Sequence, residues 1–271
     1  MLTVAHYWLR AEEYAAQQFK IAKQPDWDQA AKNLDSLVDS CAQDLHAHDR
    51  PMIRIESHLK NWKVDDSHSF GEALITKTGD CKVFTALYLA IGQTSGIPIW
   101  FELAPLHILP TLKGEDGTFT RHDTIYLPHL SPAKPDSVYI HPGTMPGIYL
   151  TPHPPEDFDD YTLFNLSTYL MHQGIRPASS AITRTLERFP DLPDALRLRA
   201  IAHSKSNKFE AAMSDINRAI SVAPQDIENY LFRALIYKAM DQPEKAQEDK
   251  AMVDRLPPSR RPAHRILDII G

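Results

Sequence analysis

A 34-residue period in the C-terminal part of the chain constrains its fold more than any other feature of the sequence. Three sets of residues recur at this spacing: Pro190, Pro224 and Pro258; Ala178, Ala212 and Ala246; and Tyr169, His203 and Tyr237. Proline ends a helix because it has no backbone N–H to donate, and alanine lets two helices approach closely. The period therefore predicts stacked helical hairpins from about residue 159 to the C-terminus.

The repeated segments resemble tetratricopeptide repeats. They fall into three copies, at about 159–192, 193–226 and 227–260. Where that family carries Leu-Gly in the first helix of a copy, this chain has Arg199-Ala200 and Arg233-Ala234. The resemblance implies an all-α array that binds a peptide or protein partner or packs against the rest of the chain. An ordinary helical bundle is the alternative.

The N-terminal residues, to about residue 63, show the apolar spacing of helices. In a first helix, one broad apolar face is predicted to contain Tyr7, Leu9, Tyr14 and Phe19, with Trp8 beside them. A second helix is predicted to begin after Asp26, whose carboxylate can cap it. Its apolar stripe consists of Leu34, Leu37, Val38, Cys41 and Leu45.

The middle of the chain, to about Leu150, combines one strongly apolar helix with short strands. The helix is predicted over residues 81–94, and Gly96 and Pro98 prevent its continuation. Strands are predicted at 97–103, 106–112, 118–127 and 137–140. We therefore expect an α+β fold in two domains. Residues 1–158 would form N-terminal helices and this core, and residues 159–271 the helical repeats.

Cys81 opens the apolar helix, in the sequence TKTGDCKVFTALYLAIG. A thiol at a helix N-terminus faces unpaired backbone N–H groups and the positive end of the helix dipole, and both favour the thiolate. Gly79 permits a tight turn into the helix, and Asp80 can cap it. Cys81 is therefore a candidate nucleophile, with a small buried core residue as the alternative.

These residues resemble the transglutaminase-like superfamily, whose core is related to that of papain. The superfamily carries Gly-x-Cys at the start of a helix, a Gly-Ile-Pro type of break at its end, then a histidine on one strand and an aspartate on the next. Gly79, Cys81 and the break at Gly96-Ile97-Pro98 match this pattern. The resemblance implies a transglutaminase-like cysteine-hydrolase core that performs acyl transfer through its thiol.

The order of residues along the chain selects the histidine and the acid of such a site. His107 opens a strand, a hairpin loop at 113–117 follows, and Asp123 lies 16 residues after His107. We predict Cys81 as nucleophile, His107 as its proton partner and Asp123 as the carboxylate that orients the imidazole. His122 is the alternative base. Because adjacent strand residues face opposite sides, His122 cannot act together with Asp123.

Over nearly its whole length the chain is similar to bacterial transglutaminase-like proteins whose core is fused to C-terminal tetratricopeptide repeats. Many members of that subgroup lack the nucleophilic cysteine, which this chain retains as Cys81. The chain has His141 where the subgroup would have an Asp-Pro pair, so His141 is a third possible orienting residue. His107 also fits a core histidine, and Asp123 a polar residue at a strand edge.

Composition and motifs argue against other classes of function. The formal net charge of -6 gives no indication of nucleic-acid binding, and no apolar run reaches the about 20 residues that span a membrane. Two cysteines provide no disulfide framework, which favours a reducing, cytoplasmic location. The 13 histidines lack metal-binding spacing, and there is no phosphate-binding glycine loop. We therefore expect no cofactor and no metal site.

The sequence thus predicts a cysteine-dependent acyl-transfer enzyme, namely a peptidase, amidase, deamidase or transglutaminase. It would act on a peptide or protein amide, with the repeats recruiting the substrate or a partner. One alternative is a catalytically silent transglutaminase-like scaffold for protein binding. Another is a small-molecule amide hydrolase whose repeats cover the core. Hydrolysis and transamidation share one acyl-enzyme and differ in whether water or an amine arrives next.

Overall fold

The computed structural model describes residues 2–45, 50–65, 69–105, 107–124, 131–132, 139–140, 143–173, 175 and 179–256. Contacts between residues divide the chain into two compact units. The first comprises Met1–Lys134 and Leu150–Thr162, and the second comprises Pro135–Tyr149 and Leu163–Gly271. The chain therefore passes between the units after residues 134, 149 and 162. The last of these positions is near the boundary at 158/159 that the repeat period predicts.

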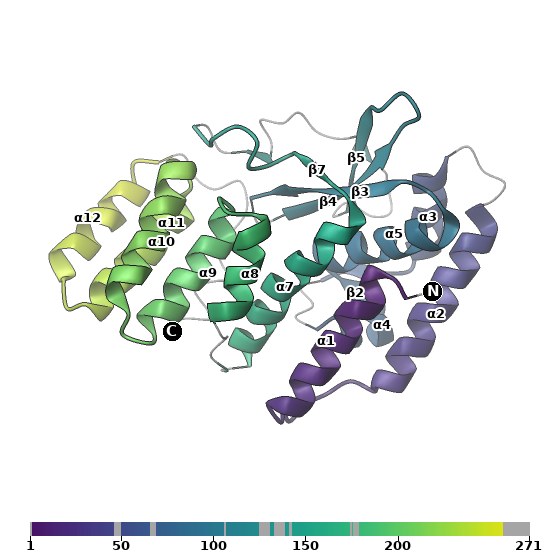
Figure 1. Ribbon diagram of the computed structural model, residues 1–271, viewed down its shortest axis with the longest axis horizontal. Coiled ribbons are helices and arrows are strands. Elements are labelled where there is room, and N and C mark those ends of the chain that lie inside the picture. Colours follow the sequence, from purple (N-terminus) through teal and green to yellow (C-terminus); the bar gives the residue numbers. More distant parts are fainter. Residues whose placement is uncertain are drawn as a thin grey trace. The chain divides into compact units, whose positions relative to one another are not determined.

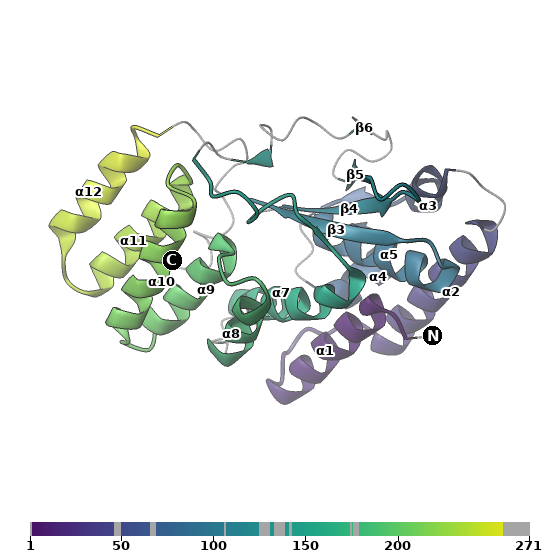
Figure 2. The same ribbon diagram turned by 45° about the horizontal axis from the view of Figure 1, so that its top comes forward.

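The first unit is mixed α/β. Its helices are α1 (Val4–Gln18), α2 (Trp27–Leu45), α3 (Pro51–Leu59), α4 (Phe70–Thr76) and α5 (Cys81–Ser95). A short parallel pair is formed by β1 (Lys63–Val64) and β2 (Thr78–Gly79). An antiparallel sheet has the order β6-β5-β4-β3-β7. Its strands are β3 (Ile99–Ala104), β4 (His107–Lys113), β5 (Phe119–Asp123), β6 (Ser131–Pro132) and β7 (Pro152–His153). Figures 1 and 2 both show α1, α4 and α5 on one side of this sheet.

The apolar helix predicted over residues 81–94 is confirmed as α5. The Asp80 carboxylate accepts the backbone N–H groups of Lys82 and Val83, at 2.9 and 3.2 Å, and so caps the helix as predicted. Gly96 ends it with φ at +73°, a conformation that favours glycine. The helix is apolar on all sides because it contacts the sheet on one side and α1 and α2 on others.

The strands predicted at 97–103, 106–112 and 118–127 are confirmed as β3, β4 and β5, with β5 ending at Asp123. The loop between β4 and β5 closes through a hydrogen bond from Gly114 N to Thr118 O, at 2.8 Å. Of the strand predicted at 137–140, only residues 139–140 are described, and neither lies in a strand. The β3–β4 and β4–β5 hairpins, which the candidate site requires, therefore lie at the centre of the sheet.

The predicted apolar face of α1 is confirmed at Leu9, which is buried, and is wrong at its three aromatic residues. Tyr7, Tyr14 and Phe19 are 52%, 66% and 51% exposed, whereas Trp8 is buried and stacks on Phe70 with ring centroids 4.5 Å apart. Tyr7 and Trp8 are neighbours that point to different sides, and the partner ring on α4 decides which of them is buried. The stripe predicted for α2 is buried at Leu34, Val38, Cys41 and Leu45.

Glu12 is a charged residue on the buried face of α1, and it is 0% exposed. Its carboxylate accepts the backbone N–H of Phe70 at 2.7 Å, the N–H of Gly71 at 3.1 Å and the hydroxyl of Ser69 at 3.1 Å. These donors form the N-terminus of α4, so Glu12 caps a helix remote in sequence. Burial raises the pKa of Glu12 to about 7 against the lowering effect of these hydrogen bonds.

The second unit is helical. Its helices are α7 (Phe158–His172), which begins in the first unit, α8 (Ser179–Arg188), α9 (Pro193–Ser204), α10 (Phe209–Val222), α11 (Ile227–Ala239) and α12 (Pro243–Val253). Helices α9 and α11 begin 34 residues apart, as do α10 and α12. Helix α9 packs on α10, and α11 on α12 (Figure 1). Ala212 and Ala246 are buried at equivalent positions, as the period predicts, while Ala178 and Pro258 lie outside the described residues.

Arg199 and Arg233, each the first residue of an Arg-Ala pair where the resembled family carries Leu-Gly, form a repeated pattern of contacts. Arg199 binds both carboxylate oxygens of Asp215, at 2.7 and 2.8 Å, and Arg233 binds Asp249 in the same way, at 2.7 and 2.9 Å. Each arginine also donates backward by 16 residues: Arg199 to Thr183 at 3.2 Å, and Arg233 to Asn217 at 2.8 Å. Each guanidinium therefore links its own hairpin to the preceding helix.

A buried ionic cluster lies between α9 and the start of α11. Arg197 is 1% exposed and donates to Asp226 Oδ2 at 2.7 Å and to Asn229 Oδ1 at 2.8 Å. It also forms an ion pair with Asp194. The hydroxyl of Tyr149 donates to Asp194 Oδ2 at 3.2 Å. Two carboxylates thus share one buried guanidinium, and the Asp194 side chain keeps 10% of its surface exposed.

Residues 143–149, which we call the strap, lie on these helices within the second unit. Met145 N donates to the backbone oxygen of Val222 at 2.9 Å. Gly143 has φ at +77°, and a Cβ there would lie 3.3 Å from the ring of Pro224. Together with the Tyr149 hydroxyl bond, these contacts hold a segment that precedes the repeats against the repeats themselves.

Glu228 adds an ionisable group to the buried cluster. It is 1% exposed, and neither of its carboxyl oxygens has a hydrogen-bond partner in the described part of the chain. Burial raises its pKa to about 7; Arg197 acts in the opposite direction, and Asp226 and Asp194 act in the same one. A carboxyl group whose pKa is higher in the folded state is favoured there in its protonated form.

We predict that Glu228 makes the protein less stable as the pH rises. Its stabilising effect is complete below the unfolded pKa near 4.5 and is lost as the pH rises through about 7. Glu228→Gln cannot ionise, so it should lose less stability between pH 5 and pH 8.5, by at most about 3 kcal/mol. Urea unfolding across this range measures the difference, with the exposed carboxylate variant Glu248→Gln as control. Parallel pH profiles for wild type and Glu228→Gln would contradict the prediction.

Candidate active site

Cys81 is the first residue of α5 and is 7% exposed. The strand β2 ends two residues earlier, at Gly79. A Cβ on Gly79 would lie 2.7 Å from Cγ1 of Val83, so glycine is needed where β2 runs so close to the first turn of α5. The sequence motif Gly-x-Cys thus has a local steric reason: the glycine lets the chain turn directly into the helix that carries the thiol.

A cation lies beside the first turn of α5. Lys82 Nζ is 3.0 Å from Asp80 Oδ2. Burial alone would lower the pKa of Lys82, but Asp80, Cys81 and, more weakly, Glu12 raise it above its ordinary value. The interaction is reciprocal, so the ammonium group favours a negative charge on Cys81, as does the helix N-terminus. Sequence analysis did not select Lys82, although its position next to the candidate nucleophile was a visible signal.

His107 and Asp123 are brought together as predicted. Nε2 of His107 lies 3.3 Å from Oδ1 of Asp123, and the two side chains are 1% and 2% exposed. β4 and β5 are antiparallel neighbours with Thr111 opposite Arg121. Continued along both strands, this register makes His107 and Asp123 diagonal neighbours on one face of the sheet. A buried imidazole bound to a buried carboxylate has a fixed ring orientation.

The same face of the sheet carries a second ionic pair. Arg121 donates to the carboxylate of Glu102, which is 1% exposed. Glu102 pairs with Leu109 in the β3–β4 register, between the positions of His107 and Thr111. Sequence analysis missed this pair because Glu102 lies in the apolar run IWFELA, where a lone carboxylate gives no sign of its partner. The face therefore contains two buried carboxylates, each with a basic partner.

The N-terminal half of α5 reaches the beginning of β4. The hydroxyl of Thr85, one helical turn after Cys81, donates to the backbone oxygen of Ile108 at 3.4 Å. Farther along, a Cβ on Gly92 would lie 3.0 Å from Ile99 Cγ1, so α5 covers the face that carries Ile99. His107 belongs to the opposite face by strand alternation. Contact between Cys81 and His107 stays a prediction. The two side chains would have to meet at the end of the sheet where β4 begins.

The alternative histidines are distinguished by their positions. His122 is on the face opposite to Asp123, as the alternation along β5 predicts, and it pairs with Pro132 of β6. Burial lowers the pKa of His122 to about 4. His141 lies outside the described residues, as does His129. His107 and Asp123 therefore share one face of the sheet, and His122 lies on the opposite face, the one that α5 covers.

The second cysteine has a different environment. Cys41 lies in α2 and is 0% exposed. Burial, followed by the nearby Asp44 carboxylate, raises the pKa of its thiol to about 12. A thiol of this kind reacts slowly, because the thiolate is the nucleophilic form. Cys41 is therefore an internal reference for the reactivity of Cys81.

Within the described ranges, no three His, Cys, Asp or Glu side chains are arranged to hold a metal ion. The helices that the structure describes include none with the length and apolar character of a membrane span. No protein-family model, curated protein sequence or solved structure matches the chain.

Proposed function

We propose that the first unit is a transglutaminase-like thiol acyltransferase or hydrolase that acts on an amide of a peptide or protein. The observation that carries this proposal is the buried pair of His107 on β4 and Asp123 on β5, 3.3 Å apart, with the beginning of β4 bound to the N-terminal half of α5 through Thr85. Cys81 at the first position of α5, between Asp80 and Lys82, supplies the nucleophile. A core with a purely structural role does not require a thiol at a helix start together with a buried histidine–carboxylate pair.

In the proposed reaction the thiolate of Cys81 attacks the amide carbonyl carbon and forms a tetrahedral intermediate. With Nε2 of His107 bound to Asp123, Nδ1 is the nitrogen assigned to the thiol proton. The imidazolium gives this proton to the departing amine nitrogen as the C–N bond breaks and the thioester forms. Water then yields the free acid, or a second amine yields a new amide.

His107 is the better base of the two candidates. An imidazole with a pKa near 4, such as that of His122, is a weak base and would not hold a thiolate as an ion pair at neutral pH. Asp123 lies beside His107 and on the opposite face from His122. We therefore propose Cys81, His107 and Asp123 as the catalytic residues, and the helical hairpins, on the strength of their tetratricopeptide-like period, as the part that recruits a peptide or protein.

The proposal is tested by the reactivity of Cys81. At pH 6.5 a thiol with an ordinary pKa near 8.5 is only about 1% thiolate, so an ion pair with His107 can raise its reactivity up to about 100-fold. We expect iodoacetamide to label Cys81 at least about tenfold faster than Cys41, as measured by mass spectrometry of each cysteine peptide. His107→Ala and Asp123→Asn should remove most of the difference, and the control His203→Ala should not.

Three outcomes of these experiments distinguish the proposed thiol enzyme from its alternatives. Labelling of Cys81 no faster than Cys41 would contradict thiol catalysis and favour the silent scaffold for protein binding. Loss of reactivity only in His122→Ala would assign the base to His122 instead, and loss only in His141→Ala would assign the orienting role to His141. Reactivity that depends on His107, followed by trapping of a thioester on Cys81 with a glutamine-containing peptide, would support the proposal. Release of free acid or of a product joined to a fluorescent amine then separates hydrolysis from transamidation.

A further inference from the structure

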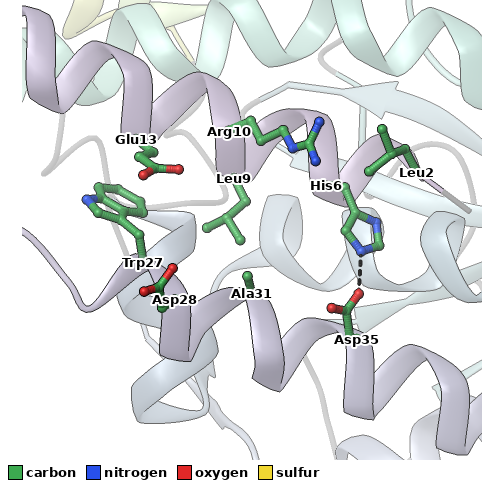
Figure 3. Close-up of a pocket in the computed structure, with 9 residues that line it drawn as sticks. All are labelled: Leu2, His6, Leu9, Arg10, Glu13, Trp27, Asp28, Ala31 and Asp35. Carbon is green, nitrogen blue, oxygen red and sulfur yellow. Dashed lines mark hydrogen bonds and ion pairs between the residues drawn. The ribbon is translucent and has the colours of Figure 1, made fainter.

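A pocket of about 440 Å³ lies between α1 and α2 of the first unit, and its lining includes none of the candidate catalytic residues (Figure 3). Its volume is in the range of pockets that hold a small ligand or one side chain. It is lined by residues spaced along one face of each helix: Leu2, His6, Leu9, Arg10 and Glu13 of the α1 segment, and Trp27, Asp28, Ala31 and Asp35 of α2. Leu9 and Ala31 form an apolar middle between two polar ends.

One end of the pocket contains its basic side chains, and one of them is bound to a carboxylate. Nε2 of His6 lies 2.9 Å from Oδ1 of Asp35, and Nδ1 of the same ring lies 2.7 Å from the Thr3 hydroxyl. Figure 3 shows the Arg10 side chain extending toward this end, near Leu2 and His6. The basic groups of the pocket are therefore gathered at the end that contains Asp35.

The other end combines an indole ring with two carboxylates that have no cationic partner. Figure 3 shows Glu13 and Asp28 near Trp27. Among the described residues, no lysine, arginine or histidine forms an ion pair with Glu13 or Asp28, whereas Gln17 donates to Glu13 Oε1 at 3.2 Å. The indole N–H donates to Gln24 Oε1 at 3.1 Å, which fixes the ring edge. A Cβ on Gly71 would lie 2.6 Å from Cζ3, so glycine at this position lets the ring pack on α4.

We propose that this pocket binds the side chain of a lysine in a peptide or protein partner. Its alkyl chain would lie along Leu9 and Ala31, and its ammonium group would lie between Glu13, Asp28 and the face of Trp27. An ammonium is attracted to the face of an indole ring, and each carboxylate adds a screened ion pair. A neutral or anionic ligand would leave both carboxylates at the Trp27 end of the pocket without a cation.

The test uses the full-length protein and Nα-acetyl-lysine N-methylamide, followed by two-dimensional NMR. The indole N–H signal of Trp27 is assigned by its absence in Trp27→Phe, and the other three of the 4 tryptophans serve as internal references. We expect saturable shifts of the Trp27 signal that weaken as salt is added. Glu13→Gln and Asp28→Asn should each weaken binding about 2- to 5-fold. The control Asp39→Asn, an exposed carboxylate of α2 outside the pocket, should leave binding unchanged.

The comparison ligands decide what the pocket recognises. The Nε-acetylated form of the same probe has no charge and should not shift the Trp27 signal; equal binding of this form would overturn recognition of an ammonium. Equal binding of 1,5-diaminopentane would overturn the assignment to a lysine within a peptide and indicate a site for small amines. Absence of any shift at the Trp27 signal would overturn the site altogether. Binding should persist in Cys81→Ala, because the pocket does not depend on the proposed acyl transfer.

Discussion

Arg197→Met should lower the free energy of unfolding of the second unit by about 3–5 kcal/mol, one of the two largest effects that we expect of a single substitution in this protein. Methionine has a similar length but no charge, so the carboxylates of Asp194 and Asp226 would remain buried without their guanidinium. The amide of Asn229 and the hydroxyl of Tyr149 cannot compensate two negative charges. Urea unfolding followed by far-ultraviolet circular dichroism measures the loss.

The control for this substitution is Arg218→Met. Arg218 forms an ion pair with Asp191 at 2.6 Å, but its side chain is 50% exposed, so the loss should be below about 1 kcal/mol. Adding Asp226→Asn to Arg197→Met removes one of the unpaired charges and should restore part of the stability. Equal effects of the two arginine substitutions would show that Arg197 is not a buried ionic centre.

Glu12→Ala should destabilise the first unit by about 2–4 kcal/mol, which combines a cavity with unsatisfied backbone donors at the start of α4. The donors are the N–H groups of Phe70 and Gly71 and the hydroxyl of Ser69. Glu12→Gln keeps one acceptor oxygen and fills the same volume, so its effect should be smaller. Thermal and urea unfolding of both variants measure this order.

The pH dependence provides a second readout for Glu12. Because its folded pKa, about 7, exceeds the ordinary value of 4.5, the protonated form stabilises the fold, and that contribution is lost as the pH rises through about 7. The destabilisation caused by Glu12→Ala should therefore be larger at pH 5 than at pH 8.5. Gln17→Ala, on the exposed side of the same helix, is the control. A destabilisation that does not change with pH would contradict a buried, protonated Glu12.

The elements that follow from local chemistry were predicted from the sequence. The start of α5 follows from Asp80 as N-cap and its end from Gly96, and both were predicted to within one residue. The pairing of His107 with Asp123 followed from a short hairpin loop, since the loop fixes which residues of β4 and β5 lie near each other. In each case the determining residues are neighbours in sequence or are separated by one tight turn.

The features that depend on tertiary partners were not predicted. Periodicity treats Glu12 and Arg197 as surface residues, but each is buried because distant groups satisfy its charge or hydrogen bonds. The face of α1 was assigned wrongly because the choice between Tyr7 and Trp8 depends on Phe70. The pocket at Trp27 has no local signature either, since its residues come from two neighbouring helices. A single sequence contains no direct information on these pairings.

The three passages of the chain between its two units have a consequence for how the protein can be divided. A fragment that begins at residue 159, where the 34-residue period suggests a cut, would contain Asp194 and Arg197 but not Tyr149, whose hydroxyl binds Asp194. A fragment that ends at 158 would contain the strap without the helices on which it lies. The helical array therefore cannot be exchanged between proteins as one continuous segment. Recombination between genes would also have to transfer the strap, which lies within the preceding α/β region of the sequence.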